Sequence, residues 1–348
     1  MDALLRKAVA YFARPFSSWS AFSGSVLSPV AALNNPATAH AWPYLLAGLA
    51  CAWLVYRFSG RPGRAGFLRF AFPAAAYGHR SARADYAFVA FDLLTKPLLV
   101  SPLVAAVSWC LYLALHRVLP SLPLRLPQSA AARGVLASLA ALLVSDLGLF
   151  LSHWLMHRVK LLWLFHEVHH SAEVLTPVTV YRVHPVEALV NGLVGSVVGA
   201  LVAVFYGAAS GNEARFLDVY GVNVILMAFF LAGFHLRHSH VWLSFGPALS
   251  RVFISPAQHQ IHHSKERKHW NKNFGYTFAF WDLLLGTLYV PKARERVEFG
   301  IPDTDPEDFA TVPRLYGLPL LKAWRRLTAK APAAAALPAR PETERTLG

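Results

Sequence analysis

The sequence predicts an all-α integral membrane protein, with about four to five transmembrane or membrane-embedded helices and a cytosolic helical cap. Three observations lead to this prediction. Apolar residues make up 55% of the 348-residue chain and charged residues only 15%, against about 25% in soluble domains. Five long apolar stretches divide the chain. The segments that follow them hold most of its 16 histidines.

The charge balance narrows the possible partners. The chain has 33 Lys and Arg residues against 19 Asp and Glu, a net charge of +14. In an apolar chain, excess Lys and Arg residues mark the loops on the cytoplasmic side of a membrane and attract anionic lipid head groups. No basic-aromatic motif is present, so no nucleic-acid partner is expected. Cys51 and Cys110 lie in apolar runs and can form neither a thiolate metal cluster nor a disulfide framework.

The first element expected is a helix in the membrane interface, because residues 1–16 mix basic and apolar side chains at helical spacing. Crossing a bilayer takes about 20 apolar residues. By that measure the first apolar stretch is marginal. The second is overlong and carries Lys96, Pro97 and Pro102, which predict a kink or a break. The five stretches are Ala41–Tyr56, Phe88–Leu115, Gly134–Ser152, Val186–Tyr206 and Phe216–Phe234.

The basic residues orient these stretches. Six arginines lie between Arg57 and Arg83, which predicts a cytoplasmic segment. Stretches two and three then form one hairpin and stretches four and five another, with the short loop Ser210–Arg215 outside. Residues 153–184 and 235–269 therefore meet at the cytoplasmic face. We divide the chain into an N-terminal interfacial helix with membrane spans (1–130), a histidine-bearing domain (131–300) and a C-terminal extension (301–348) whose tail from Ala329 is expected to be disordered.

Three histidine boxes dominate these two segments. Histidines spaced i, i+3 and i+4 share one face of a helix, as metal ligands require. An uncharged imidazole near the bilayer must be hydrogen-bonded or metallated. Eight imidazoles exceed the four ligands of a structural zinc ion, so the count favours two metals, while iron, zinc, copper and nickel all suit imidazole. The boxes are His153-x3-His157, His166-x2-His169-His170 and His259-x2-His262-His263.

Further polar residues accompany the boxes. One or two of His235, His238 and His240 are expected to complete the coordination. His184 is either another ligand or a hydrogen-bond partner of one, whereas His269 is expected to face solvent. Asp146 precedes His153 by two helical turns on the same face. A carboxylate at this depth requires a partner. Either it orients an imidazole or the substrate channel, or it forms a hydrogen bond to a neighbouring span.

The pattern of boxes, together with motifs beyond them, resembles the fatty acid hydroxylase/sterol desaturase superfamily of integral membrane di-iron enzymes. The resemblance covers about Asp146–Tyr289, some 40% of the chain. The motifs that carry it, besides the boxes, are His169-His170-Ser171 with Thr176-Pro177, Arg182, His184-Pro185, Ser255-Pro256, Asn273-Phe274-Gly275, Trp281-Asp282 and Gly286-Thr287.

The resemblance implies two iron ions, which zinc can replace in purified protein, and O2-dependent attack on a C–H bond of a fatty acyl, sterol or isoprenoid lipid. Hydroxylation and desaturation both remain open. A separate electron-transfer protein would supply two electrons. The expected location is a bacterial inner membrane, with the boxes cytoplasmic. Asp146 and Asn273 are the candidate catalytic residues, and the candidate metal ligands are His153, His157, His166, His169, His170, His184, His235, His238, His240, His259, His262 and His263.

Two functions from other classes compete with this one. A metal transporter would distribute its ligands along a path across several spans, whereas these histidines crowd at one face. A zinc-dependent membrane hydrolase needs only three ligands and one open position. Iron content together with O2-dependent product formation separates the oxidase from both.

Overall fold

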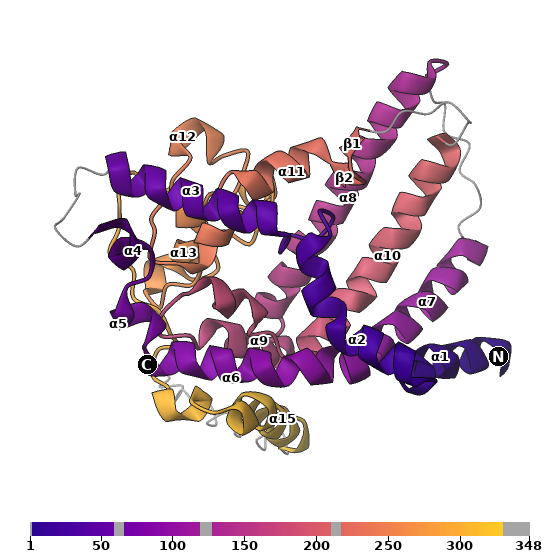
Figure 1. Cartoon of the computed structure of the whole chain (residues 1–348), viewed down its shortest axis with the longest axis horizontal. Helices are drawn as coiled ribbons and strands as arrows, with labels where there is room; N and C mark the ends of the chain where they lie inside the picture. Colours follow the sequence, from indigo (N-terminus) through magenta and orange to yellow (C-terminus); the bar gives the residue numbers. More distant parts are fainter. Residues whose placement is uncertain (1, 59–65, 119–126, 210–216, 330–348) are drawn as a thin grey trace, which may run out of the picture.

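The computed structural model describes residues 2–58, 66–118, 127–209 and 217–329, which are mostly helical (Figure 1). The named strands of the described residues, β1 (Asp218–Val219) and β2 (Val222–Asn223), form a short antiparallel hairpin. The α-helices are α1 (Asp2–Ala13), α2 (Trp19–Ala31), α3 (Trp42–Phe58), α4 (Gly66–Ala71), α5 (Ala74–Tyr77), α6 (Arg80–Thr95), α7 (Ser101–Val118), α8 (Ala130–Arg158), α9 (Lys160–His170), α10 (Pro185–Ala209), α11 (Val224–Leu231), α12 (Gly246–Leu249), α13 (Pro256–His262), α14 (Phe280–Leu284) and α15 (Val312–Thr328).

Three helical segments are long and apolar enough to cross a membrane, namely Arg80–Leu115, Ala130–Arg158 and Pro185–Ala203. The first two contain the second and third predicted stretches, and the last covers most of the fourth. Helix α10 lies between α8 and α7 (Figure 1) and packs on both. Glycines permit this close approach: a Cβ on Gly148 would lie 2.3 Å from Val198 Cγ2, and one on Gly192 2.2 Å from Val104 Cγ1.

The prediction of a kink in the second stretch is confirmed. A π-helical turn, Lys96–Val100, separates α6 from α7, and the two helices run in different directions (Figure 1). Pro97 has no N–H to donate, so the regular hydrogen-bond ladder is interrupted there. The bend lets α6 run along the body of the molecule while α7 packs against α10.

The first stretch forms α3, a 17-residue helix. At 1.5 Å per residue it is about 26 Å long, short of a hydrocarbon core about 30 Å thick. Residues 2–13 form α1, as the amphipathic N-terminus predicts. The loop Ser210–Arg215 and the tail beyond Ala329 lie outside the described residues.

The prediction of a fifth span, Phe216–Phe234, is wrong. Tyr220 and Gly221, both with positive φ, turn the chain into the β1–β2 hairpin. The side chain of Asn223 then accepts a hydrogen bond from Ile225 N and begins α11, which has only eight residues. The hairpin is anchored to α8 by a 2.8 Å hydrogen bond from Leu217 N to Ser138 Oγ. The chain therefore runs back toward the histidines through the short helix α11, which is too short to cross a membrane.

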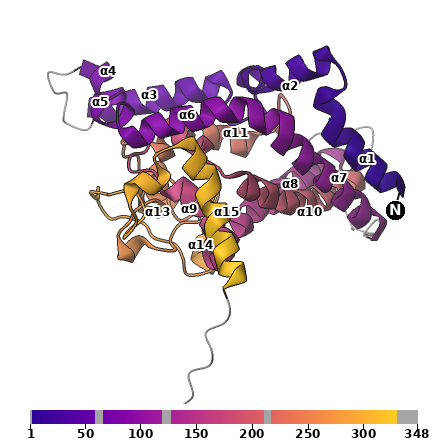
Figure 2. The ribbon, with the colours of Figure 1, turned by 90° about the horizontal axis from the view of Figure 1, so that it is seen from below.

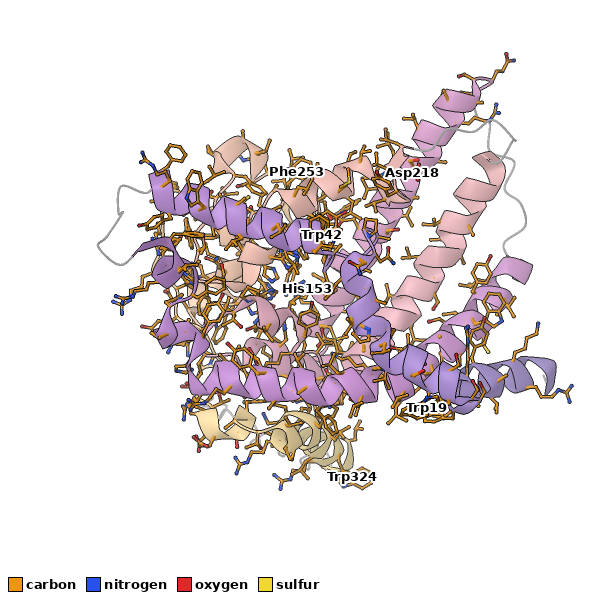
Figure 3. All side chains as sticks on the ribbon, in the orientation of Figure 1. Trp19, Trp42, His153, Asp218, Phe253 and Trp324 are labelled. Atoms are coloured by element: carbon orange, nitrogen blue, oxygen red, sulfur yellow. The ribbon has the colours of Figure 1, made fainter. Side chains whose placement is uncertain are left out.

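The histidine-bearing helices α9 and α13 meet through their side chains, with His170 Nε2 3.1 Å from His262 Nε2, in the body of the molecule from which α8 and α10 extend (Figure 1). Helix α15 crosses α9 on the far side from these long helices (Figure 2). Lys322 on α15 donates a 2.5 Å hydrogen bond to Glu167 on α9. On its outer face Trp324 projects away from the chain (Figure 3). The C-terminal helix thus braces the helix that carries the second histidine box.

Candidate metal centre

The first two histidine boxes lie on consecutive helices. His153 and His157 occupy the last two turns of α8. Val159, in an extended conformation, ends α8 and precedes α9. The break turns the chain so that His166, His169 and His170 on α9 face the end of α8, and the His157 and His166 rings lie 4.8 Å apart.

The third box depends on a local cap. Ser255 accepts a hydrogen bond from Gln258 N, and Gln258 Oε1 accepts one from Ser255 N, so the two residues form a capping box at the start of α13. Pro256 follows at the first helical position, where its missing N–H costs nothing. The short helix then presents His259 and His262, with His263 at its C-cap.

The structure brings nine of the twelve candidate ligands into two groups. Within each group one ligand atom from every residue lies within 4.8 Å of the others. Figure 3 marks His153 in the middle of the helical body. The five-histidine group comprises His153, His157, His166, His170 and His262, and the four-histidine group comprises His169, His238, His259 and His263.

The spacing of the ring nitrogens fits a metal ion. In the four-histidine group, His238 Nε2 lies 3.2 Å from His169 Nε2, 3.1 Å from His263 Nε2 and 3.0 Å from His259 Nε2. Metal–nitrogen bonds of about 2.0–2.1 Å in a tetrahedron would separate the nitrogens by about 3.3 Å. A neutral imidazole has one N–H, so hydrogen bonds alone cannot satisfy all of these contacts. A cation at the centre would.

The five-histidine group is oriented from outside by backbone carbonyls and a carboxylate. His153 Nδ1 donates to Phe274 O at 2.9 Å, and His262 Nδ1 donates to Lys272 O at 2.8 Å. His166 Nδ1 donates to Glu187 Oε1 at 2.9 Å. These bonds place the proton on Nδ1 and leave Nε2 free as a ligand, the usual arrangement around a metal. His166 Nε2 has no hydrogen-bond partner among the described residues.

Burial keeps these imidazoles uncharged. It lowers the pKa of His166 and of His169 to about 3. Burial, reinforced by neighbouring imidazoles, also holds the pKa of His170, His262 and His263 well below the ordinary value of 6.5. Neutral imidazole is the form that binds a metal.

Three candidate ligands, His184, His235 and His240, lie outside both groups. His184 uses both ring nitrogens: Nε2 donates to Tyr316 O at 3.1 Å and Nδ1 accepts from Val186 N at 3.1 Å. His235 Nε2 donates to Ala39 O at 2.7 Å, and His240 Nε2 donates to Phe70 O at 2.6 Å. Each of these rings donates to a backbone carbonyl and none lies within either group, so we leave all three out of the proposed ligand set.

The two candidate catalytic residues, Asp146 and Asn273, form hydrogen bonds to backbone groups of other segments. The Asp146 carboxylate accepts hydrogen bonds from Thr277 N at 2.9 Å, Phe278 N at 3.1 Å and Trp281 Nε1 at 3.0 Å. Asn273 has a φ of 59°. Its side chain donates a hydrogen bond to Gln258 O at 3.0 Å and accepts one from Tyr289 N at 2.7 Å. Both side chains therefore fix the segment that supplies Phe274 O to His153.

The prediction that His269 faces solvent is wrong. Its side chain is fully buried, and its Nε2 lies 3.2 Å from Glu295 Oε2. The charged neighbours of His269 in the sequence give no sign of this, because Glu295 reaches it from 26 residues away.

Two carboxylates have roles that the sequence does not predict. Glu187 orients His166, and its signal was its position as the lone acid of the apolar helix α10. Asp282 accepts hydrogen bonds from Phe274 N at 2.8 Å and Gly275 N at 2.7 Å. A Cβ at Gly275 would lie 2.5 Å from Phe278 O, so only glycine fits this turn.

Two cavities reach the histidines from different sides. The larger, which we call the α8 cavity, has a volume of about 590 Å³ and is lined by His153, His166, His169, His238 and His259. It follows one face of α8 from His153 back to Leu142, eleven residues or about 16 Å of helix. Its walls there include Leu149, Leu226 and Phe230. An apolar chain fits such walls.

The second, the Trp163 cavity, has a volume of about 420 Å³ and is lined by His157, His170, His262 and His263. Trp163 forms part of its wall, with its ring centroid 5.0 Å from that of His157 and 5.4 Å from that of His170. The other charged or aromatic residues around it are Lys160, Lys265, Trp270, Asp303 and Arg326. This opening is predominantly basic.

Comparison with known proteins agrees with this geometry. A family model described as fatty acid hydroxylase matches residues 138–287, the segment that holds all nine grouped histidines. The resemblance of this segment to the fatty acid hydroxylase/sterol desaturase superfamily is thereby confirmed. No solved structure matches the chain.

Three relatives illustrate the range of this superfamily. The chain is 30% identical to an ornithine lipid hydroxylase of Rhizobium tropici over 46% of its own length and 44% of the relative's. It is 26% identical to the human alkylglycerol monooxygenase over 47% and 32%. It is 31% identical to a very-long-chain aldehyde decarbonylase of Oryza sativa over 45% and 24%. The chain thus spans less than half the length of each.

Proposed function

We propose that this protein is a membrane oxidoreductase that uses O2 to hydroxylate a C–H bond of a lipid. The observation that carries the proposal is the pair of histidine groups, five of whose rings line a cavity that also has apolar walls along α8. Two of the relatives named above are a hydroxylase and a monooxygenase of lipids. In the overall reaction, one oxygen atom enters the C–H bond, and the other leaves as water with two electrons and two protons.

The nine grouped histidines would hold two iron ions, which supply the activation of O2 that an unactivated C–H bond requires. His153, His166 and His262 are oriented for this by the partners at their Nδ1 atoms. All-nitrogen ligation does not select iron over zinc, so zinc can occupy the site in purified material.

The chain's own residues bind and shield the lipid. The α8 cavity would take a fatty acyl, sterol or isoprenoid chain, with Leu149 and Phe230 among its walls. Because the cavity runs along a helix long enough to cross the membrane, the substrate can remain partly in the bilayer. Exclusion of water along these walls protects the reacting carbon.

The electrons would come from a separate acidic electron-transfer protein that approaches the Trp163 cavity. Lys160 and Arg326 are exposed at this opening and supply complementary charge. Trp163 packs against two rings of the five-histidine group and shortens the path from the surface.

We further propose that the protein is multi-pass and lies in a bacterial inner membrane, with the histidine groups at the cytoplasmic face. The three span-length helices support the membrane location. The arginine-rich segment between α3 and α6 supports the orientation.

The test combines metal analysis with isotope labelling. Purified protein is reconstituted with iron, a reductase system and bacterial lipid extract under isotopically labelled O2. We expect two irons per chain and a lipid that gains one labelled oxygen atom, with no product under nitrogen. Product whose oxygen comes from water would favour a hydrolase. Metal flux into vesicles without any lipid product would favour a transporter.

A further inference from the structure

One buried carboxylate oxygen in the α8 cavity has no partner. Glu187 is 6% exposed and lines the cavity. Its Oε1 accepts the hydrogen bond from His166, whereas its Oε2 has no hydrogen-bond partner among the described residues. A buried carboxylate oxygen left unpaired is costly, so a donor is required in the cavity beside it.

A second polar side chain lies one helical turn away. Asn191 follows Glu187 by four residues, so both lie on one face of α10, and both line the cavity. Ser152 of α8 donates a hydrogen bond to Asn191 Oδ1, which fixes the amide. In a helix otherwise composed of apolar and small residues, these two form a polar site within an apolar cavity.

We propose that Glu187 Oε2, assisted by Asn191, binds a hydrogen-bond donor carried by the lipid itself, a hydroxyl or an amide N–H. The inference rests on the proposed function and narrows its substrate class. Because Glu187 contacts His166, the donor lies beside the five-histidine group. The carbon that is oxidised is therefore within a few bonds of this donor, and the hydrocarbon chain extends along α8.

The test measures binding without turnover. Purified protein in lipid nanodiscs is titrated under nitrogen with hexadecanol and with its methyl ether, which has the same chain but no donor. Wild-type protein should bind the alcohol about tenfold more tightly, the usual effect of one added hydrogen bond. Equal affinity for the two probes would overturn the proposal and assign the position beside Oε2 to water.

Two variants locate the effect. Glu187→Gln keeps an oxygen for His166 but replaces the free acceptor by an amide, so the preference for the alcohol should vanish. Glu307→Gln, an exposed carboxylate paired with Arg80, is the matched control and should keep the preference. A Glu187→Gln protein that still prefers the alcohol tenfold would also refute the proposal. Because no O2 is used, the result is independent of whether the oxidation itself occurs.

Discussion

Arg182 and Asp85, 97 residues apart in the chain, form a buried ion pair with Nη1 and Oδ1 2.7 Å apart. The guanidinium also donates to Val168 O at 2.8 Å, to Ser171 Oγ at 2.7 Å and to Phe309 O at 3.2 Å. One side chain thus joins α6, the end of α9 and the segment that leads into α15. Since α9 carries three grouped histidines, this contact ties the histidine groups to the rest of the fold.

We expect Arg182→Ala to destabilise the protein by about 3–5 kcal/mol, because it leaves Asp85 buried without its partner. Thermal unfolding in detergent measures the change. Arg80→Ala is the matched control: Arg80 pairs with Glu173 and Glu307 at the surface and should cost at most about 1 kcal/mol. Equal losses in both variants would contradict the role assigned to Arg182.

The two histidine groups should lose their metal separately. We expect the double variant His169→Ala, His259→Ala to retain one ion of two, because only the four-histidine group is depleted. His157→Ala, His262→Ala should empty the other group. Metal analysis by mass spectrometry gives the stoichiometry, and His79→Ala, whose ring only caps α6, should keep both ions. A double variant that retains two ions would show the grouping to be wrong.

Metal-free protein should lose stability as the pH falls from about 6.5 toward 3. Burial lowers the pKa of His166 and His169 to about 3, whereas the unfolded chain has an ordinary value near 6.5. Between these values the unfolded state binds more protons, so acidification favours unfolding. Unfolding temperatures of chelator-treated protein at pH 7, 6 and 5 test this. A constant temperature across that range would contradict the burial of neutral imidazoles.

Asp146→Asn should act on stability. Its three hydrogen-bond partners are all donors, and an amide would turn its NH2 toward one of them. We expect a loss of about 1–3 kcal/mol, with the position of lipid oxidation unchanged. Unfolding measurements and product analysis together check this. A variant of full stability that oxidised a different carbon would instead show that Asp146 contacts the substrate.

Charge reversal at the Trp163 cavity should weaken the electron donor's binding. For Lys160→Glu, Arg326→Glu we expect the KM for an acidic donor protein to rise about tenfold, with kcat at saturating donor nearly unchanged. Steady-state kinetics at low salt measures both. Arg251→Glu, exposed but away from this cavity, should have no effect. An unchanged KM in the double variant would place the docking surface elsewhere.

The sequence by itself determined the helical class, three of the predicted spans and the residues able to bind metal. These features depend on local periodicity: a run of apolar residues long enough to cross a membrane, and histidines spaced to share a helix face. The prediction of the fifth span is wrong for a local reason as well. Tyr220 and Gly221 turn the chain where hydropathy alone predicts a helix.

Only the tertiary structure decided which histidines act together. His169 and His170 are adjacent in the sequence yet belong to different groups, as do His262 and His263. Successive residues on a helix point about 100° apart, so each neighbour faces a different set of partners. Which partners these are depends on how α8, α9 and α13 pack. The same packing brings Glu187 from α10 to His166. It also lets backbone carbonyls of distant segments accept hydrogen bonds from His184, His235 and His240.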